Sequence, residues 1–115
     1  MTFEKLPIEG MYKIQMQKHG DDRGFFARVF CQNEYKELGL FTDIAQVNMT
    51  SSKDKYTFRG MHYQLPPKAE DKVMLCTKGA YYDVSIDLRP HSLTFKKSFG
   101  IELNEDNKTM LYIPK

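Results

Sequence analysis

The stretch that decides the fold is Ala80-Tyr81-Tyr82-Asp83-Val84-Ser85-Ile86-Asp87. Alternate residues of a β-strand point to the same face, so the odd-numbered residues share one side and Tyr82, Val84 and Ile86 share the other. Asp83 stands inside an apolar run, where a carboxylate needs a partner to offset its burial. The stretch therefore predicts a strand with one polar inner face.

Similar segments precede and follow this strand. They are short, rich in β-branched and aromatic residues, and bounded by Gly, Pro, Asn or Asp, which is typical of strands. The predicted strands are residues 11–17, 24–30, 45–50, 57–64, 72–78, 80–87, 97–103 and 109–114. One short helix is expected at residues 34–38, with Asn33 as N-cap and Gly39 as its C-terminal stop. The pattern predicts an all-β jelly roll, which protects strand edges by closure or by pairing between subunits.

The length of 115 residues favours one domain, residues 1–115, because a domain of this size buries roughly two thirds of its unfolded surface. Hydrophobic residues make up 41% and charged residues 28%, which is typical of a globular protein. The net charge of +2 comes from 17 basic and 15 acidic residues, so no overall basic field attracts nucleic acid. We expect no nucleic-acid partner, and any anion site must be local.

Cys31 and Cys76 lie in apolar surroundings without metal-ligand spacing, so we expect buried free thiols in a reducing compartment. The N-terminus has no apolar run of signal-peptide length, and no stretch approaches the roughly 20 apolar residues of a membrane span. These features predict a cytoplasmic protein without a membrane partner.

The chemistry is concentrated in Arg59-Gly60-Met61-His62-Tyr63-Gln64 and the charged residues after it. Histidine is the side chain that most often acts as a general base, and Asp83 opposite His62 would orient the imidazole and raise its basicity. Lys72 would hold the negative charge that develops on an oxygen. Strict alternation separates Arg59 from His62, unless a bulge at Gly60 re-aims the arginine.

A metal site is the alternative to this chemistry. Small β-barrels of the cupin family bind metal through two histidines two residues apart, followed by a glutamate and a glycine. The corresponding residues here are Gly60, His62, Gln64, Glu70 and Gly79. Glutamine is a weak ligand for transition metals compared with imidazole. A site without metal is therefore predicted.

Two further sets of residues could contact a ligand. Arg23 follows Asp21 and Asp22 in a turn before a strand, and a guanidinium there suits bidentate contact with phosphate. Gln46 and Asn48 are two residues apart, so both amides would face one side. Each set also fits an ordinary solvated surface.

Taken together, these motifs resemble the dTDP-4-dehydrorhamnose 3,5-epimerase family in order and spacing, from about residue 11 to residue 114. The matching stretches are residues 21–26, 46–48, 59–64, Lys72 and residues 83–89. The resemblance implies a dimeric cupin jelly roll that acts without metal or organic cofactor. Its substrate would be a nucleotide-linked 4-keto-6-deoxyhexose.

The resemblance also implies a role for each motif. His62 would be the general base that removes protons from the carbons flanking the C4 ketone, with Asp83 as its dyad partner, and Lys72 would stabilise the enolate oxygen. The pyrophosphate would be bound by Arg23 and Arg59. The nucleotide would be contacted by Gln46 and Asn48.

The sequence departs from the family in two ways. Arg28 stands where the family has a glutamate that helps to hold the nucleobase, which leaves the base open. The family also continues past the Tyr112-Ile113-Pro114 strand to a second histidine, the acid tyrosine and further strands, so we expect those strands to be missing here. A noncatalytic nucleotide-sugar binding or dimerisation module, or a related 3-epimerase or ketoisomerase, therefore remains an alternative.

Overall fold

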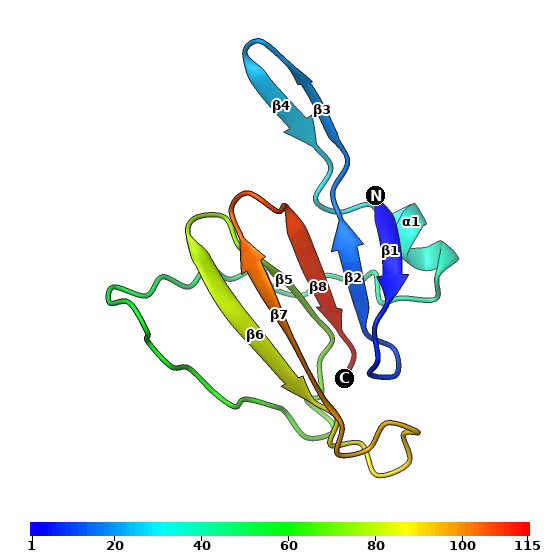
Figure 1. The fold of residues 1–115 in the computed structure, drawn as a ribbon. Helices are drawn as coiled ribbons and strands as arrows, with labels where there is room; N and C mark the ends of the chain where they lie inside the picture. The colour runs from blue at the N-terminus through cyan, green and yellow to red at the C-terminus, as the bar shows by residue number, and fades with distance from the viewer.

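A computed structural model describes all 115 residues and is built mainly of strands (Figure 1). The elements are β1 (Thr2–Lys5), β2 (Tyr12–Gln15), β3 (Lys18–Asp21), β4 (Gly24–Ala27), α1 (Gln32–Glu37), β5 (Lys72–Leu75), β6 (Ala80–Ile86), β7 (Ser98–Asn104) and β8 (Thr109–Ile113). The all-β architecture is confirmed. No helix is long and apolar enough to cross a membrane.

The central sheet brings the two ends of the chain together. Its strand order is β1-β2-β8-β5, and every neighbouring pair is antiparallel. Tyr12 pairs with Tyr112 across β2 and β8, and Lys72 pairs with Ile113 across β5 and β8. Strand β8 is therefore central, and all its residues except Ile113 are buried.

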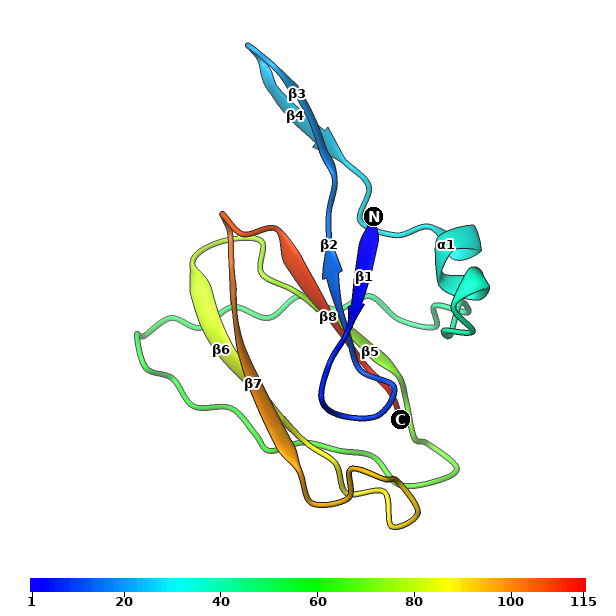
Figure 2. The ribbon, with the colours of Figure 1, turned by 45° about the vertical axis from the view of Figure 1, so that its right-hand side comes forward.

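The two faces of this sheet pack against different partners, because alternate residues of β8 point in opposite directions. Leu111 belongs to a cluster with Ile8, Met11, Cys76 and Leu103, on the side of the β6–β7 layer. Met110 and Tyr112 belong to a second cluster with Ile14, Met16 and Tyr35, which is covered by α1. Figure 2 shows β6 and β7 on one side of the sheet and α1 on the other.

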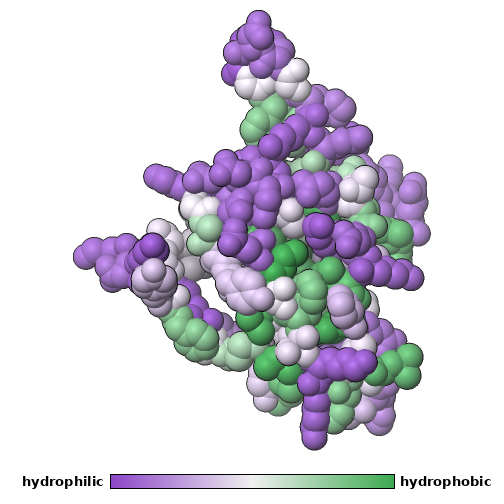
Figure 3. Space-filling model, viewed as in Figure 1, coloured by the Kyte–Doolittle hydropathy of each residue, from purple (hydrophilic) through white to green (hydrophobic).

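Strands β6 and β7 form the second layer, paired from Ala80↔Asn104 to Ile86↔Ser98. Exposure alternates along the whole of β6, with Tyr81, Asp83 and Ser85 less exposed than their neighbours. This confirms the predicted faces. The outward face stays apolar and open, with Tyr82, Val84 and Ile86 at 68%, 42% and 43% exposure. Figure 3 shows hydrophobic residues, in green, between hydrophilic residues, in purple, on the face viewed as in Figure 1.

The hairpin of β3 and β4 projects away from the body (Figure 1) and pairs from Lys18↔Ala27 to Asp21↔Gly24. Strands β1 and β3 were not predicted, since both are short and rich in charged residues. Pairing with β2 and β4, rather than composition, places them in strands.

Helix α1 is confirmed, but it begins earlier than predicted. Cys31 is the N-cap, without a side-chain capping hydrogen bond, and Asn33 lies inside the helix. The earlier start places Tyr35 against Phe3 and Phe30, with ring centroids 5.5 and 4.9 Å away, and this packing outweighs the missing cap. Gly39 ends the helix as expected, with a φ of 68°.

The strands predicted at residues 45–50 and 57–64 are not formed. Both stretches lie in a long irregular connection between α1 and β5, and residues 42–64 make no backbone–backbone hydrogen bond. Strand formation needs a neighbour whose backbone groups satisfy the hydrogen-bond ladder, and no strand of the chain pairs with these residues. Apolar side chains such as Val47, Met49 and Phe58 are more than 80% exposed as a result.

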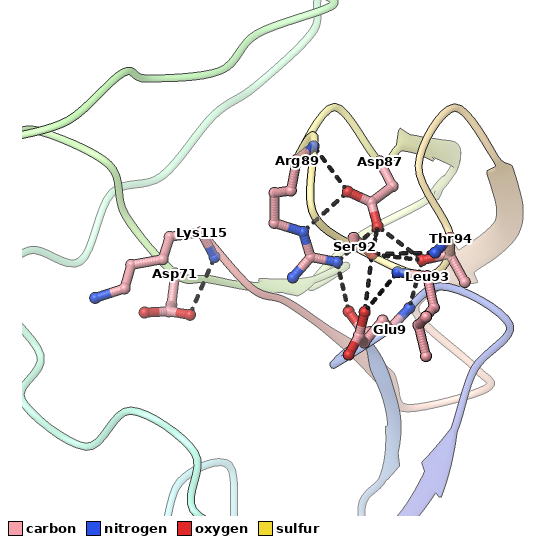
Figure 4. Close-up of polar contacts among 8 residues, drawn as sticks. All are labelled: Glu9, Asp71, Asp87, Arg89, Ser92, Leu93, Thr94 and Lys115. Carbon is pink, nitrogen blue, oxygen red and sulfur yellow. Dashed lines mark hydrogen bonds and ion pairs between the residues drawn. The ribbon is translucent and has the colours of Figure 1, made fainter.

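A polar cluster closes the end of the β6–β7 layer (Figure 4). The buried carboxylate of Asp87 accepts hydrogen bonds from Arg89, Ser92 and Thr94. Glu9 joins the cluster from the β1–β2 turn, where its carboxylate accepts from Ser92 and from the Leu93 N–H. The cluster thus ties the loop at residues 87–97 to the turn at residues 6–11.

Candidate active site

Charged residues of β5 and β6 enter the space between the two layers. Lys72 lies on the same face of β5 as Met74, which packs against the cluster of Leu103 and Leu111. Asp83 lies on the inward face of β6, two residues from Tyr81, which packs on the same cluster. The alternation of two strands on facing layers therefore brings an ammonium and a carboxylate toward one region.

Partial burial governs the charge of Asp83. Desolvation raises the pKa of this carboxyl above its ordinary value, while a hydrogen bond from Ser85 Oγ at 3.4 Å and the positive charge of Lys72 act to lower it. Desolvation dominates because the serine bond is long and no other hydrogen bond reaches the carboxylate. Asp83 thus has spare acceptor capacity for a further partner.

Lys72 is held at the strand end by a surface carboxylate. Its Nζ lies 3.2 Å from Glu70 Oε1, and the lysine and glutamate side chains are 34% and 46% exposed. An ion pair this exposed contributes little to stability and breaks easily. The ammonium is therefore free to meet a negative charge that arrives from solution.

The structure places His62 on the long connection and not on a strand. The imidazole is exposed, and no hydrogen bond joins it to Asp83. Gly60, two residues earlier, has a φ of 123°, a backbone conformation that L side chains rarely adopt. Because residues 57–64 form no strand, neither the predicted alternation nor a bulge at Gly60 applies to this stretch. The pairing of His62 with Asp83 stays a prediction.

Arg59, on the same connection, is exposed and contacts its own segment. Its Nε donates to Ser52 Oγ at 3.2 Å, and its second guanidinium nitrogen donates to the Ser51 carbonyl oxygen at 3.2 Å. These contacts fold the segment back on itself. Three donors of the guanidinium remain free for a ligand.

The other predicted binding residues lie on exposed surfaces. Gln46 and Asn48 share one side, with Asn48 Nδ2 3.4 Å from Gln46 Oε1. Arg23 forms a forked ion pair with Asp21 at the hairpin tip, as close as 2.6 Å. This pair raises the pKa of Arg23 and lowers that of Asp21. The structure does not bring Arg23 near the other predicted residues, because the hairpin projects from the body (Figure 1).

Arg28 lies at the base of the hairpin, where it lines a hollow of about 90 Å³ with Met1, Gln17, His19 and Phe26. Its guanidinium is 2.8 Å from Glu34 Oε1. Glu34 also binds the amino terminus of the chain at 2.8 Å, and these two partners lower the pKa of its carboxyl. Arg28 is therefore fixed by a charge network and not simply solvated.

Tyr81 and Ser85 flank Asp83 on the inward face and were not marked as site residues from sequence. The hydroxyl of Tyr81 is buried and has no hydrogen-bond partner, and burial raises its pKa to about 12. The alternation of β6 already placed both side chains beside Asp83. That position was the available signal.

Lys72 gives this region a positive charge that can hold an anion, and the carboxyl of Asp83 lies beside the neutral side chains of Tyr81 and Ser85. Lys72 supplies a cation, Asp83 a desolvated acceptor and His62 a solvent-facing base. No group of three His, Cys, Asp or Glu side chains comes together that could hold a metal ion. The residues suit carbonyl acid–base chemistry on an anionic ligand.

Comparison with known proteins identifies one family. The sequence profile described as dTDP-4-dehydrorhamnose 3,5-epimerase matches residues 5–115. The epimerase of that name from Escherichia coli strain K12 is 40% identical over all of this chain and 62% of its own length.

Two solved structures share the fold. The dTDP-4-dehydrorhamnose 3,5-epimerase of Bacillus anthracis, with TDP and PPi bound, has a TM-score of 0.94 and 35% identity, covering 99% of this chain and 65% of that one. The dTDP-6-deoxy-D-glucose-3,5-epimerase of Legionella pneumophila, in complex with dTDP-4-keto-L-rhamnose, has a TM-score of 0.91 and 33% identity, covering 99% and 60%.

These likenesses place the chain among all-β proteins with the cupin-like fold of the epimerases described above. The chain belongs to the dTDP-4-dehydrorhamnose 3,5-epimerase family. It spans about three fifths of the length of the relatives that it matches.

Proposed function

We propose that the protein inverts C3, C5 or both in a dTDP-linked 4-keto-6-deoxyhexose. The observation that supports this most is the placement of Lys72 and Asp83 on facing layers of a fold shared with epimerases of this family. The TDP and dTDP-sugar bound to the two solved relatives point to the same ligand class.

The reaction begins with loss of a proton beside the ketone. His62 takes the proton from C3 or C5, and the electrons of the broken C–H bond form a C=C bond to C4 while the ketone oxygen becomes an enolate. Lys72 meets the negative charge on that oxygen, which lowers the barrier by several kcal/mol at most, or about 100- to 1,000-fold in rate. Reprotonation on the opposite face gives the epimer.

The remaining residues act before and around this step. Asp83 orients the imidazole of His62, and its free acceptor capacity leaves room for that contact. Arg23 and Arg59 bind the pyrophosphate, and Gln46 and Asn48 contact the nucleotide. The proton donor is not assigned to any residue of this chain.

We infer that the protein acts as a cytoplasmic homodimer. Both cysteines are free, as a reducing compartment favours, although only Cys76 is buried and Cys31 is half-buried. The outward face of β6 and the unpaired apolar segment after α1 would be covered by a second copy or by further strands. Light scattering across a dilution series tests the dimer, and a constant monomer mass would contradict it.

The chemistry is tested by incubation with dTDP-4-dehydro-6-deoxyglucose in deuterated water, followed by NMR at C3 and C5. We expect deuterium at each carbon that is deprotonated. His62→Ala should slow this exchange by at least about 100-fold, because a positioned general base contributes that much. His91→Ala is the matched control, since His91 is also exposed but lies in the loop of residues 87–97.

The outcomes separate the alternatives. Exchange at C3 alone identifies a 3-epimerase, and exchange without epimer identifies a base that lacks its acid. Binding of the nucleotide sugar in calorimetry without any exchange identifies a noncatalytic module and contradicts the proposal. dTDP-glucose, which has no ketone, should bind and exchange nothing.

A further inference from the structure

One buried hydroxyl lies where both ends of the long connection meet the central sheet. Tyr112 is 4% exposed on β8, and its hydroxyl donates a hydrogen bond to Asp71 Oδ1 at 2.9 Å. The same oxygen atom of Tyr112 accepts a hydrogen bond from the Phe41 N–H at 3.3 Å. Phe41 begins the connection and Asp71 ends it, so a single phenol joins the two.

Asp71 is fixed from a second direction. Its Oδ1 also accepts the N–H of Lys115 at 3.2 Å, a contact that Figure 4 shows beyond the end of β8. The burial of Tyr112 raises its pKa to about 12, with Asp71 contributing in the same direction, so the hydroxyl keeps its proton at neutral pH. The hydroxyl of Tyr112 therefore remains a donor to Asp71 at neutral pH.

Few other contacts could hold this connection in place. Residues 42–64 make no backbone–backbone hydrogen bond, and the side-chain bonds of Thr57 and Arg59 stay within the segment. Its position relative to the sheet is therefore set mainly at its two ends. Asp71 is also the residue directly before Lys72.

We propose that Tyr112, acting through Asp71, is a positioning residue for the site. It fixes the segment that carries Arg59 and His62 relative to Lys72 on β5. The inference rests on the proposed function for its effect on rate, but its effect on the segment does not. Because displacement of a base by about 1 Å can cost 100-fold in rate, a clamp at the base of the segment has catalytic consequences.

The test uses Tyr112→Phe, Asp71→Ala, their double mutant and Asp71→Asn. In the deuterium-exchange assay, each of the first two should lower the rate about 10-fold, and the double mutant should lower it no further, because the two residues form one unit. Asp71→Asn keeps an oxygen that accepts the tyrosine O–H and should stay within about 2-fold of the wild type. Additive losses, or equal losses in Asp71→Asn and Asp71→Ala, would overturn the proposal.

A second measurement does not depend on activity. Backbone ¹⁵N relaxation should show larger amplitudes for residues 41–71 in Tyr112→Phe and Asp71→Ala, with the sheet amides unchanged. Tyr12→Phe is the matched control, because Tyr12 packs against Tyr112 at 6.4 Å between ring centroids and its hydroxyl makes no hydrogen bond. Unchanged amplitudes in both variants would refute the clamp even if the wild type exchanges deuterium. A wild type without exchange would refute the proposed function alone.

Discussion

Asp83 lies in β6 and Asp87 directly follows the end of that strand, four residues later. Their surroundings shift the pKa values of the two carboxyls in opposite directions. Asp87 is 4% exposed and receives hydrogen bonds from Arg89, Ser92 and Thr94, and the pKa of its carboxyl lies far below the ordinary range. Asp83 has one long bond from Ser85, and burial raises its pKa. Burial alone therefore does not decide the charge of a carboxyl.

The difference distinguishes an aspartate that stabilises the fold, Asp87, from an aspartate that is available for chemistry, Asp83. The donors around Asp87 are supplied entirely by its own loop and match the carboxylate oxygens, so nothing is left for a ligand. The region of Asp83 supplies desolvation without matching donors, which is a pattern common at functional sites. Four substitutions test this contrast.

The largest effect is expected for Asp87→Asn. It leaves Arg89 without its ion-pair partner and places an amide where three donors converge, so the free energy of unfolding should fall by about 3 kcal/mol. Urea unfolding measures the loss. Asp83→Asn is the matched control on the same face, and an equal loss in both variants would contradict the contrast.

Arg89→Lys should come next. The lysine keeps the charge but cannot form the fork to Asp87 or reach the Glu9 carbonyl oxygen at the same time, so we expect a loss of about 1.5 kcal/mol. Arg23→Lys tests the same change at a solvent-exposed pair with an identical spacing to its aspartate, and should leave the midpoint of thermal unfolding unchanged. A loss confined to Arg23→Lys would argue against the role of burial.

Tyr81→Phe should raise stability by about 1 kcal/mol, because it removes a buried hydroxyl that has no partner. Tyr35→Phe removes a second such hydroxyl and should behave alike. Calorimetric unfolding of both variants provides the measurement. Destabilisation by Tyr81→Phe would show that its hydroxyl has a partner in solution, and the inward face of β6 would then be more polar than described.

The smallest effect is expected for Asp83→Asn at neutral pH, within about 1 kcal/mol of the wild type. The pH dependence is more telling. A raised pKa means that the folded state binds the proton more tightly, so Asp83 favours folding below its ordinary value of 3.8 and this contribution is lost as pH rises through the folded pKa.

Asp87 has the opposite sign, because its folded pKa is lowered. Its contribution is present above 3.8 and is lost as the pH falls below that value. Urea unfolding at a series of pH values should therefore show that Asp83→Asn removes a decline above pH 3.8 and that Asp87→Asn removes a loss below it. Identical profiles for the two variants would show that their environments do not differ.

Much of the fold followed from the pattern of side chains. The alternation in β6, the stop at Gly39 and the strands β7 and β8 were predicted to within one or two residues. The failures at residues 45–50 and 57–64 have one cause. Their composition is typical of a strand, but a strand also needs a neighbouring strand to pair with. Composition does not identify that neighbouring strand.

Part of the candidate site could likewise be predicted from the sequence, and part could not. Lys72 and Asp83 could be placed from alternation along β5 and β6. The contact between Tyr112 and Asp71 could not, because it depends on the register of β5 against β8, which local sequence does not specify. The position of His62 relative to both depends on a segment without regular structure.

The strand order of the central sheet also constrains when the protein can fold. Strand β2 pairs with β8, and Gln15 binds Thr109 across 94 positions of the chain. Contacts this distant in sequence form slowly, since the loop must close before they stabilise anything. During synthesis, β2 can pair with β1 but lacks its second neighbour until β8, near the end of these 115 residues, has left the ribosome. We therefore expect slow folding, and a need for chaperones in that interval.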